Sequence, residues 1–340
     1  MLEIWLRYDL RNPSWVGIKS TTLAAAAIEQ VEWADKNGFH TIQLPEHHCS
    51  DDNYSPSPLI LGAAMAARTS KMRIQPSAII LPLHDPVRIA EDVAVLDILS
   101  NGRVDVTVGL GYVPEEFAMF GVDLKDRSRL VEEKLKVLRR AFTGEVFDYD
   151  GRTVHVTPPP VQPGGPRLWI GGSVKATALR AAELGDGYYP MVHTPELVQT
   201  YKDACTALGK EPGRIINVTG PRNVVIAEDP EAAWHKIAPH ALHETNAYAA
   251  YAAKLGQATH FKHAENAEEL WALDIYKVLT PEEGLALFRR QRDLGRSLIL
   301  APLMAGLDPD VAWQSLELMG SKIIPQLMAD DAALTPEATV

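Results

Sequence analysis

The sequence of 340 residues contains only two cysteines, Cys49 and Cys205, which lie far apart along the chain. Two cysteines are too few for a disulfide framework or a thiolate metal site, and they fit a reducing cytoplasm. No apolar run approaches the roughly 20 residues that span a bilayer, and the N-terminus lacks the basic and apolar regions of a signal peptide. We therefore expect a cytoplasmic protein with no membrane partner.

Long basic runs are also absent, and the formal net charge at pH 7 is −11. A chain this acidic repels polyphosphate backbones, so nucleic acid is not an expected partner. Neither a Walker A loop nor a GxGxxG dinucleotide fingerprint occurs. What is present is a globular composition, with 46% hydrophobic and 23% charged residues.

The clearest local pattern is a strand–helix–strand unit over residues 73–111. It opens with the apolar run 79–81, which is typical of a buried strand, and Asp85 and Pro86 are typical of a helix N-cap and first helical position. Gly102 follows the helix as a C′ glycine does, and 104–110 is a second apolar run. Such a crossover joins parallel strands, so the unit predicts a parallel sheet.

Eight strands alternating with helices are predicted along the chain. They lie at 3–8, 39–44, 79–81, 104–110, 167–171, 187–192, 215–227 and 297–301. This pattern favours an α/β (β/α)8 TIM barrel with insertions after strands 4 and 7 over an open doubly wound sheet. We expect one barrel domain over 1–329, with a lid or insertion that is helical in pattern at 228–278, and a flexible C-terminal tail at 330–340. Residues 117–122 are expected to form a loop or short turn, and 144–166 a hairpin-like surface excursion rich in Pro and Gly.

Two adjacent histidines, His47 and His48, follow the predicted second strand in the sequence Glu46-His47-His48. In a barrel this position is the catalytic face, where a histidine can act as an acid or base near neutral pH. Adjacent side chains on an extended chain point in opposite directions, so the two rings are not expected to bind one metal together. From residue types alone, two hydrogen-bonded loop histidines are an equal alternative.

The turn Gly171-Gly172-Ser173 connects the predicted fifth strand to a helix. Backbone N–H groups at a helix N-terminus bind anions, and Ser173 and Thr177 can add hydroxyl donors. The turn is a candidate phosphate site, although an ordinary βα loop has the same pattern. Histidines also crowd the 228–278 segment, which we interpret as a polar lid, with a metal site as the less favoured alternative. They are His235, His240, His243, His260 and His263.

Taken together, several sequence pieces resemble the bacterial luciferase-like flavin monooxygenases, a superfamily of flavin-dependent (β/α)8 barrels. They occur in the family's order over nearly the whole chain. The pieces are LPEHH (44–48), AIILP (78–82), DPVR (85–88), AEDV (90–93), LD (96–97), SNGR (100–103), AAELGDG (181–187) and TPEE (280–283).

The resemblance implies roles for individual residues. His47 matches the active-site histidine beside the flavin ring, and Ser77-Ala78 matches a non-prolyl cis peptide behind that ring. The implied cofactor-binding residues also include Gly109, Gly111, Gly172, Ser173, Val174, Thr177 and Met191, with Gly172, Ser173 and Thr177 in the phosphate-binding turn. The implied substrate-binding residues are Trp5, Tyr112 and His193. Two positions depart from luciferase: Leu110 stands where it has a phosphate-binding arginine, and Gly109 where it has a reactive cysteine.

These assignments predict a monooxygenase that uses reduced FMN and O2 to oxidise a small organic substrate, with His47 as acid or base. The lack of a dinucleotide fingerprint fits a two-component system with a separate flavin reductase, and the resemblance implies a homodimer or higher homo-oligomer. A coenzyme F420-dependent oxidoreductase of the same superfamily is the main alternative. A metal-dependent TIM-barrel hydrolase and a flavin-binding protein without catalysis are alternatives of other classes.

Overall fold

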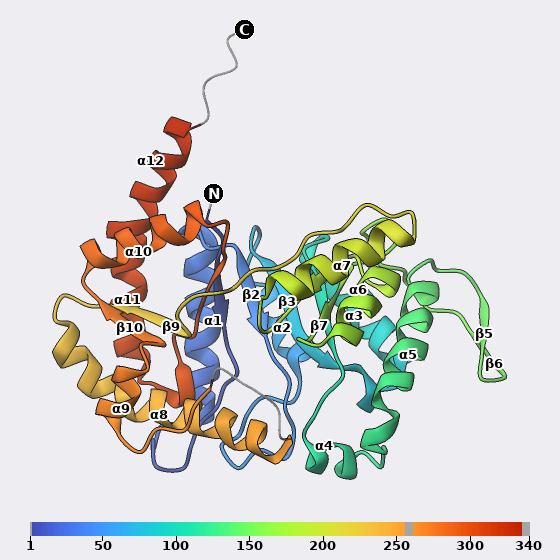
Figure 1. Ribbon diagram of the computed structural model, residues 1–340, viewed down its shortest axis with the longest axis horizontal. Coiled ribbons are helices and arrows are strands. Elements are labelled where there is room, and N and C mark those ends of the chain that lie inside the picture. Colours follow the sequence, from blue (N-terminus) through green and yellow to red (C-terminus); the bar gives the residue numbers. More distant parts are fainter. Residues whose placement is uncertain (1, 256–260, 335–340) are drawn as a thin grey trace, which may run out of the picture. The chain divides into compact units, whose positions relative to one another are not determined.

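The computed structural model describes residues 2–255 and 261–334, and the chain forms two compact units (Figure 1). Unit 1 comprises Met1–Thr41, Asp51–Tyr54 and Val218–Val340, and unit 2 comprises Ile42–Ser50 and Ser55–Asn217. No helix in the described part of the chain is both long enough and apolar enough to cross a membrane.

Unit 2 is built on strands that neighbour one another in the order β2, β3, β4, β7, β8. The pairs β3–β4, β4–β7 and β7–β8 are parallel, as the strand–helix–strand pattern predicted. Residue Ile215 adds an isolated parallel bridge to Tyr188 of β8. The strands are β2 (Thr41–Leu44), β3 (Arg73–Ile80), β4 (Asp105–Gly109), β7 (Arg167–Gly171) and β8 (Gly187–Tyr189).

Helices follow these strands, and each packs on the next along the chain (Figure 1). Asp85 caps the second of them by accepting bonds from the Val87 and Arg88 N–H groups, with Pro86 at its first position as predicted. The expected hairpin, β5 (Phe147–Tyr149) with β6 (Arg152–Val154), projects away from the helices in Figure 1. The helices are α2 (Pro58–Ala66), α3 (Pro86–Ser100), α5 (Arg127–Ala141), α6 (Lys175–Leu184) and α7 (Pro195–Ala207).

A short helix, α4 (Pro114–Met119), replaces part of the loop predicted at 117–122. Proline occupies its first turn, where a missing N–H has no cost. Phe117 is buried against Ile80 and Leu83, so tertiary packing fixes a helix too short to be predicted from periodicity.

The described residues of unit 1 form two parallel strand pairs. Strand β1 (Ile4–Arg7) pairs with β11 (Leu298–Leu300), and β9 (Asn223–Ile226) pairs with β10 (Tyr276–Leu279). Its core includes apolar side chains from both β9 and β10. The helices of this unit are α1 (Ser20–Lys36), α8 (Pro230–Leu255), α9 (Ala267–Ala272), α10 (Pro281–Asp293), α11 (Pro309–Leu318) and α12 (Ile324–Leu334).

The prediction was wrong at the seventh strand and in part of the lid. The strand expected at 215–227 is split, and its 223–226 portion lies in a separate two-stranded ladder. Strand β10 lies in the segment 228–278 that appeared helical; its Tyr276 and Val278 are buried while the residues between and after them are partly exposed. Positions 256–260 of the predicted lid lie outside the described residues. Helix α12 reaches Leu334 and so covers the first five residues of the predicted tail, and the rest of the tail lies outside the described residues.

Candidate active site

The predicted site residues of unit 2 follow the carboxyl ends of neighbouring strands. Residues 46–48 follow β2, residues 109–112 end and follow β4, and residues 172–177 follow β7. β3 lies between β2 and β4, and β7 lies beside β4. Because parallel strands end at the same edge of a sheet, these loops gather where α/β folds bind ligands.

His47 is buried and is held at both ring nitrogens. Nδ1 lies 2.7 Å from Glu116 Oε1, and Nε2 lies 3.2 Å from the Tyr112 hydroxyl. A carboxylate only accepts hydrogen bonds, so Nδ1 of the neutral ring carries the proton and Nε2 accepts from the Tyr112 O–H. The structure therefore brings together the predicted histidine, the predicted Tyr112 and a carboxylate that the sequence did not suggest.

Glu116 lies on α4 with its side chain fully buried. Its Oε1 also accepts a hydrogen bond from the His48 backbone N–H at 2.8 Å, whereas Oε2 has no partner among the described residues. Sequence reasoning missed Glu116 because α4 was not predicted. The signal available was Pro114 followed by two glutamates, directly after a strand end rich in glycine.

Two glycines shape this strand end. Gly111 has φ +70°, and a Cβ there would lie 2.5 Å from Ile80 Cγ2, so only glycine permits the turn that leads into α4. A Cβ at Gly109 would lie 2.9 Å from the Cβ of Ala78. The cysteine that luciferase has at this position therefore does not fit here without displacement of Ala78.

The Ser77–Ala78 peptide bond is cis, as the resemblance implied. Both residues are half-buried. The Ser77 hydroxyl accepts a hydrogen bond from Gln43 Nε2 at 3.3 Å, and the same amide donates to the Tyr189 hydroxyl at 2.9 Å. Gln43 therefore connects β2 to β3 and β8 below the loops of the site.

A second carboxylate, Glu46, binds two other histidines. Its Oε1 lies 2.8 Å from His48 Nε2 and 2.6 Å from His84 Nε2, and its Oε2 accepts from the Ile80 N–H. Burial acts to raise the pKa of Glu46, but the hydrogen bonds from both histidines outweigh it and lower the pKa. The three possible ligand atoms lie within 4.8 Å of one another. Because Glu46 is ionised, each histidine nitrogen that faces it carries a proton in this arrangement, and a metal would have to displace these protons to bind.

The candidate phosphate turn leads into α6. The N-cap residue Val174 provides no side-chain hydrogen bond to the first turn. Gly172 has φ +136°, and a Cβ there would lie 3.0 Å from Thr177 Oγ1, so glycine keeps the approach to this hydroxyl open. The Ser173 hydroxyl accepts a hydrogen bond from the Val192 N–H at 2.7 Å. The N–H groups and hydroxyls of this helix start form a donor set that fits a phosphate.

The remaining predicted residues have varied surroundings. Met191 is 55% exposed and Val174 57% exposed, whereas His193 is half-buried. Trp5 belongs to unit 1, where its buried indole donates to Glu3 Oε2 at 3.2 Å. In the lid segment, His240 Nδ1 donates to the Ala305 carbonyl, and His243 Nε2 pairs with Asp52, so these two rings have different partners.

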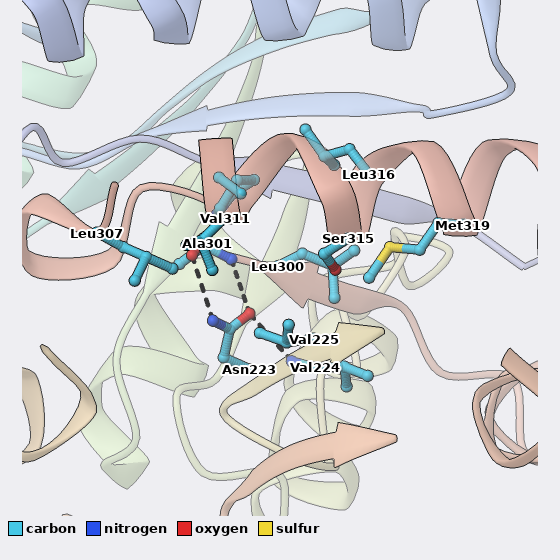
Figure 2. A pocket seen from close by; sticks show the side chains of 12 residues that line it. Asn223, Val224, Val225, Leu300, Ala301, Leu307, Val311, Ser315, Leu316 and Met319 are labelled. Atoms are coloured by element: carbon cyan, nitrogen blue, oxygen red, sulfur yellow. Dashed lines mark hydrogen bonds between the residues drawn. The ribbon is translucent and has the colours of Figure 1, made fainter. Parts of the chain in front are cut away.

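A small cavity in unit 1 lies between β9, β11 and α11, and apolar side chains line most of it (Figure 2). Asn223 Oδ1 accepts from the Ala301 N–H at 2.9 Å, and Asn223 Nδ2 donates to the Ala301 carbonyl at 3.2 Å. The Ser315 hydroxyl accepts from the Ile226 N–H. These polar groups are already satisfied, so we assign no ligand to this cavity.

Unit 1 also holds a buried cluster of arginines, which we call the arginine cluster. Arg7 and Arg222 both donate to Glu244 Oε1, at 2.7 and 3.0 Å. Arg11 is completely buried and donates to Asp52 at 2.7 Å, with its guanidinium 4.7 Å from the centre of the Tyr248 ring. The cluster also includes Asp9, so three arginines face three carboxylates. This balance of charge is typical of a structural network.

Comparison with protein families gives a direct match to residues 10–288, and the matching family is described as luciferase-like monooxygenase. The chain belongs to the luciferase-like monooxygenase family. Its α/β luciferase-like fold agrees with the architecture of both units.

Two curated relatives illustrate what this chain is similar to. An uncharacterised protein of Sinorhizobium fredii, y4vJ, is 30% identical over 175 residues, which cover 50% of this chain and 50% of that protein. The oxygenase component of the flavin-dependent trigonelline monooxygenase of Acinetobacter baylyi is 26% identical over 150 residues, covering 42% and 41%. The chain thus spans about half the length of the curated relatives it matches here.

Solved structures share the fold over nearly the whole chain. The monooxygenase RslO1 of Streptomyces bottropensis has a TM-score of 0.76 at 23% identity, over 96% of this chain and all of that one. The oxygenating constituent of 3,6-diketocamphane monooxygenase of Pseudomonas putida, solved with FMN, has a TM-score of 0.69 at 18% identity, over 96% and 98%. An F420-dependent secondary alcohol dehydrogenase has a TM-score of 0.62 at 17% identity, over 91% and 98%.

Proposed function

We propose that this protein is a flavin-dependent monooxygenase that uses reduced FMN and O2 to oxygenate a small organic substrate. The observation that carries the proposal is the arrangement in unit 2. A buried histidine with a fixed tautomer and a phosphate-sized donor set follow the carboxyl ends of strands in one parallel sheet. Family membership and the two monooxygenase neighbours support the reaction class.

The residues of unit 2 fit FMN. Gly172, Ser173 and Thr177, with the first N–H groups of α6, would hold the phosphate, because this helix start has no side-chain cap. The Ser77–Ala78 segment and Gly109 would lie behind the ring system. Because Gly109 has no Cβ, its backbone lies close to the side chain of Ala78. Gly111, Val174 and Met191 are proposed as further cofactor contacts, and Trp5, Tyr112 and His193 as substrate contacts.

Bound reduced FMN supplies the two electrons that activate dioxygen. The protein's part is to orient the cofactor, exclude water and move protons. His47 is the proton-transfer group, since its Nε2 accepts a hydrogen bond while Nδ1 is fixed by Glu116. Residues 228–278 are proposed as a lid that selects the substrate.

A separate reductase would supply the reduced FMN, as the name of the trigonelline relative, an oxygenase component, suggests by analogy.

We further propose that the parallel strands close into an eight-stranded barrel, and that this barrel forms one domain over 1–329. We also propose that the protein is a cytoplasmic homodimer or higher oligomer. Exposed apolar side chains on α2 and α3, Ile60, Val95 and Leu99, support self-association. Size-exclusion chromatography with light scattering tests this state directly.

The decisive experiment is an anaerobic titration of the protein with reduced FMN and, separately, with reduced F420. We expect saturable binding of reduced FMN, weakened at least tenfold by Gly172→Val, because the added side chain clashes with Thr177. Admission of ¹⁸O2 to the complex with a panel of ketone, terpene and aromatic substrates should then give a labelled product. Binding of F420 without binding of FMN would reject the proposal.

The second candidate is F420-dependent hydride transfer, which the structural neighbour with an F420–acetone adduct favours by analogy. The same titration separates the two, because an F420 enzyme would oxidise or reduce its substrate without oxygen. A metal-dependent hydrolase would instead need stoichiometric metal, which elemental analysis of the purified protein measures.

A further inference from the structure

We propose that Glu116 is the positioning residue that makes His47 a base at Nε2, with the Tyr112 hydroxyl marking where the proton-bearing group sits. Glu116, His47 and Tyr112 form a continuous chain of contacts. The separation from Glu116 Oε1 to His47 Nδ1 is 2.7 Å, and the separation from His47 Nε2 to the Tyr112 hydroxyl is 3.2 Å. The consequence for turnover rests on the proposed function, but the arrangement itself does not.

Glu116 fixes the tautomer of His47. Glu116 Oε1 accepts both the Nδ1–H of His47 and the backbone N–H of His48, so it holds the ring and the adjacent backbone together. A carboxylate at Nδ1 excludes the tautomer that has its proton on Nε2. Nε2 is therefore left as the acceptor, on the side of Tyr112.

Glu116 also affects the charge that the His47 ring can carry. When Nε2 takes a proton, the ring becomes an imidazolium cation between Glu116 and the proton donor. A buried carboxylate beside it stabilises this cation, as the aspartate of a Ser-His-Asp triad does for its histidine. Among the described residues, Oε2 of Glu116 has no hydrogen-bond partner, and Oε1 accepts from the His47 ring and the His48 backbone N–H, so few donors share the charge of this carboxylate. The arrangement thus favours proton uptake at Nε2.

Tyr112 lies on the acceptor side of the His47 ring. Gly111, with φ +70° and no room for a Cβ, directs the chain so that Tyr112 faces His47 and α4 places Glu116 behind it. The rings of Tyr112 and His47 lie 5.5 Å apart and nearly perpendicular, at 74°. An O–H group at the position of the Tyr112 hydroxyl loses its proton to Nε2: the O–H bond breaks, the N–H bond forms, and the oxygen keeps the electron pair.

The test is a ¹⁵N spectrum of the histidine side chains in the whole protein without flavin or substrate, at a pH where His47 is neutral. His47→Gln assigns the signals. We expect Nδ1 of His47 to be protonated and Nε2 to be of the bare, hydrogen-bonded type. In Tyr112→Phe, the ¹⁵N chemical shift of Nε2 should move further toward that of an unprotonated nitrogen without a hydrogen bond, while the shift of Nδ1 stays unchanged. A proton on Nε2 of the wild-type ring overturns the proposal.

The variant Glu116→Leu should move the proton to Nε2 or give a mixture of tautomers, whereas Glu115→Gln, on the exposed face of the same helix, should change nothing. An unchanged tautomer in folded Glu116→Leu also overturns the proposal. If that variant does not fold, the wild-type and Tyr112→Phe spectra still decide.

Where FMN turnover is found, Glu116→Leu should lower kcat by about 100-fold or more. In the background of His47→Ala, the same substitution should lower kcat much less. A wild-type tautomer as expected with no FMN binding would reject the proposed function alone.

Discussion

The arginine cluster of unit 1 and the histidine–glutamate contacts of unit 2 are both buried, but they differ in the cation that each carboxylate faces. Glu244 faces Arg7 and Arg222, which stay charged at any pH that the fold survives. Glu46 and Glu116 face histidines, which can be neutral. The first kind of contact can only hold structure, whereas the second can also move a proton without the loss of the fold.

This difference should appear first in stability. Glu244→Gln removes the carboxylate that both Arg7 and Arg222 face and leaves Arg7 with Asp9 alone, so we expect the free energy of unfolding to fall by about 3–5 kcal/mol. Urea unfolding of the variant and the wild type at pH 7.5 measures the loss. A loss below 1 kcal/mol would show that the arginine cluster does not stabilise unit 1 as argued.

The same glutamate should give the fold a dependence on acid pH. Burial acts to raise the pKa of Glu244, but the Arg222 and Arg7 guanidinium groups outweigh it and lower the pKa to about 2 from the ordinary 4.5. Above pH 4.5 both folded and unfolded states are deprotonated and the stabilisation is complete. As the pH falls toward 2, the unfolded chain takes up the proton first, so stability declines. The difference in the free energy of unfolding between wild type and Glu244→Gln should therefore decrease by about 2 kcal/mol between pH 6 and pH 3. A gap that stays constant over this interval would contradict the assignment.

Substitution of Glu46, which faces histidines, should lower the free energy of unfolding by less than substitution of Glu244. Glu46→Gln removes one charge, but the amide oxygen can still accept one of the hydrogen bonds that His48 and His84 donate to Glu46. We expect a loss of about 1–2 kcal/mol, set by one unsatisfied buried donor. Urea unfolding at pH 8 provides the comparison with Glu244→Gln. Equal losses in the two variants would mean that the nature of the cation does not matter.

The sequence predicted the histidine of the site but not the carboxylate behind it, for a physical reason. His47, the glycines after β4 and the turn before α6 lie next to strand ends, and strand ends are visible in the hydrophobic pattern. Glu116 lies 69 residues from His47 along the chain and on a helix of six residues, where no periodicity can develop. Its role depends on the burial of Phe117 against Ile80 and Leu83, which only the folded chain provides.

The same distinction applies to the fold: elements with a local sequence signal were predicted, and a strand that depends on a distant partner was not. Strands followed by helices with clear caps were predicted, as at Asp85. Strand β10 was missed because Tyr276–Leu279 is short and directly follows a helical stretch, and its pairing with β9 joins segments some 50 residues apart. Pairing between distant segments leaves no trace in a local pattern.

The smallest predicted effect tests whether burial, rather than contact geometry, decides these differences. Arg129 and Glu133 on α5 form an ion pair at 2.8 Å, as short as the buried pairs, but their side chains are 58% and 56% exposed. Water already solvates both groups, so Glu133→Gln should change the free energy of unfolding by less than about 0.5 kcal/mol. The effect should also shrink in 0.5 M salt, because exposed charges are screened. If Glu133→Gln cost as much as Glu46→Gln in the same urea titration, distance alone would account for both. The contrast between structural arginines and proton-moving histidines would then lose its basis.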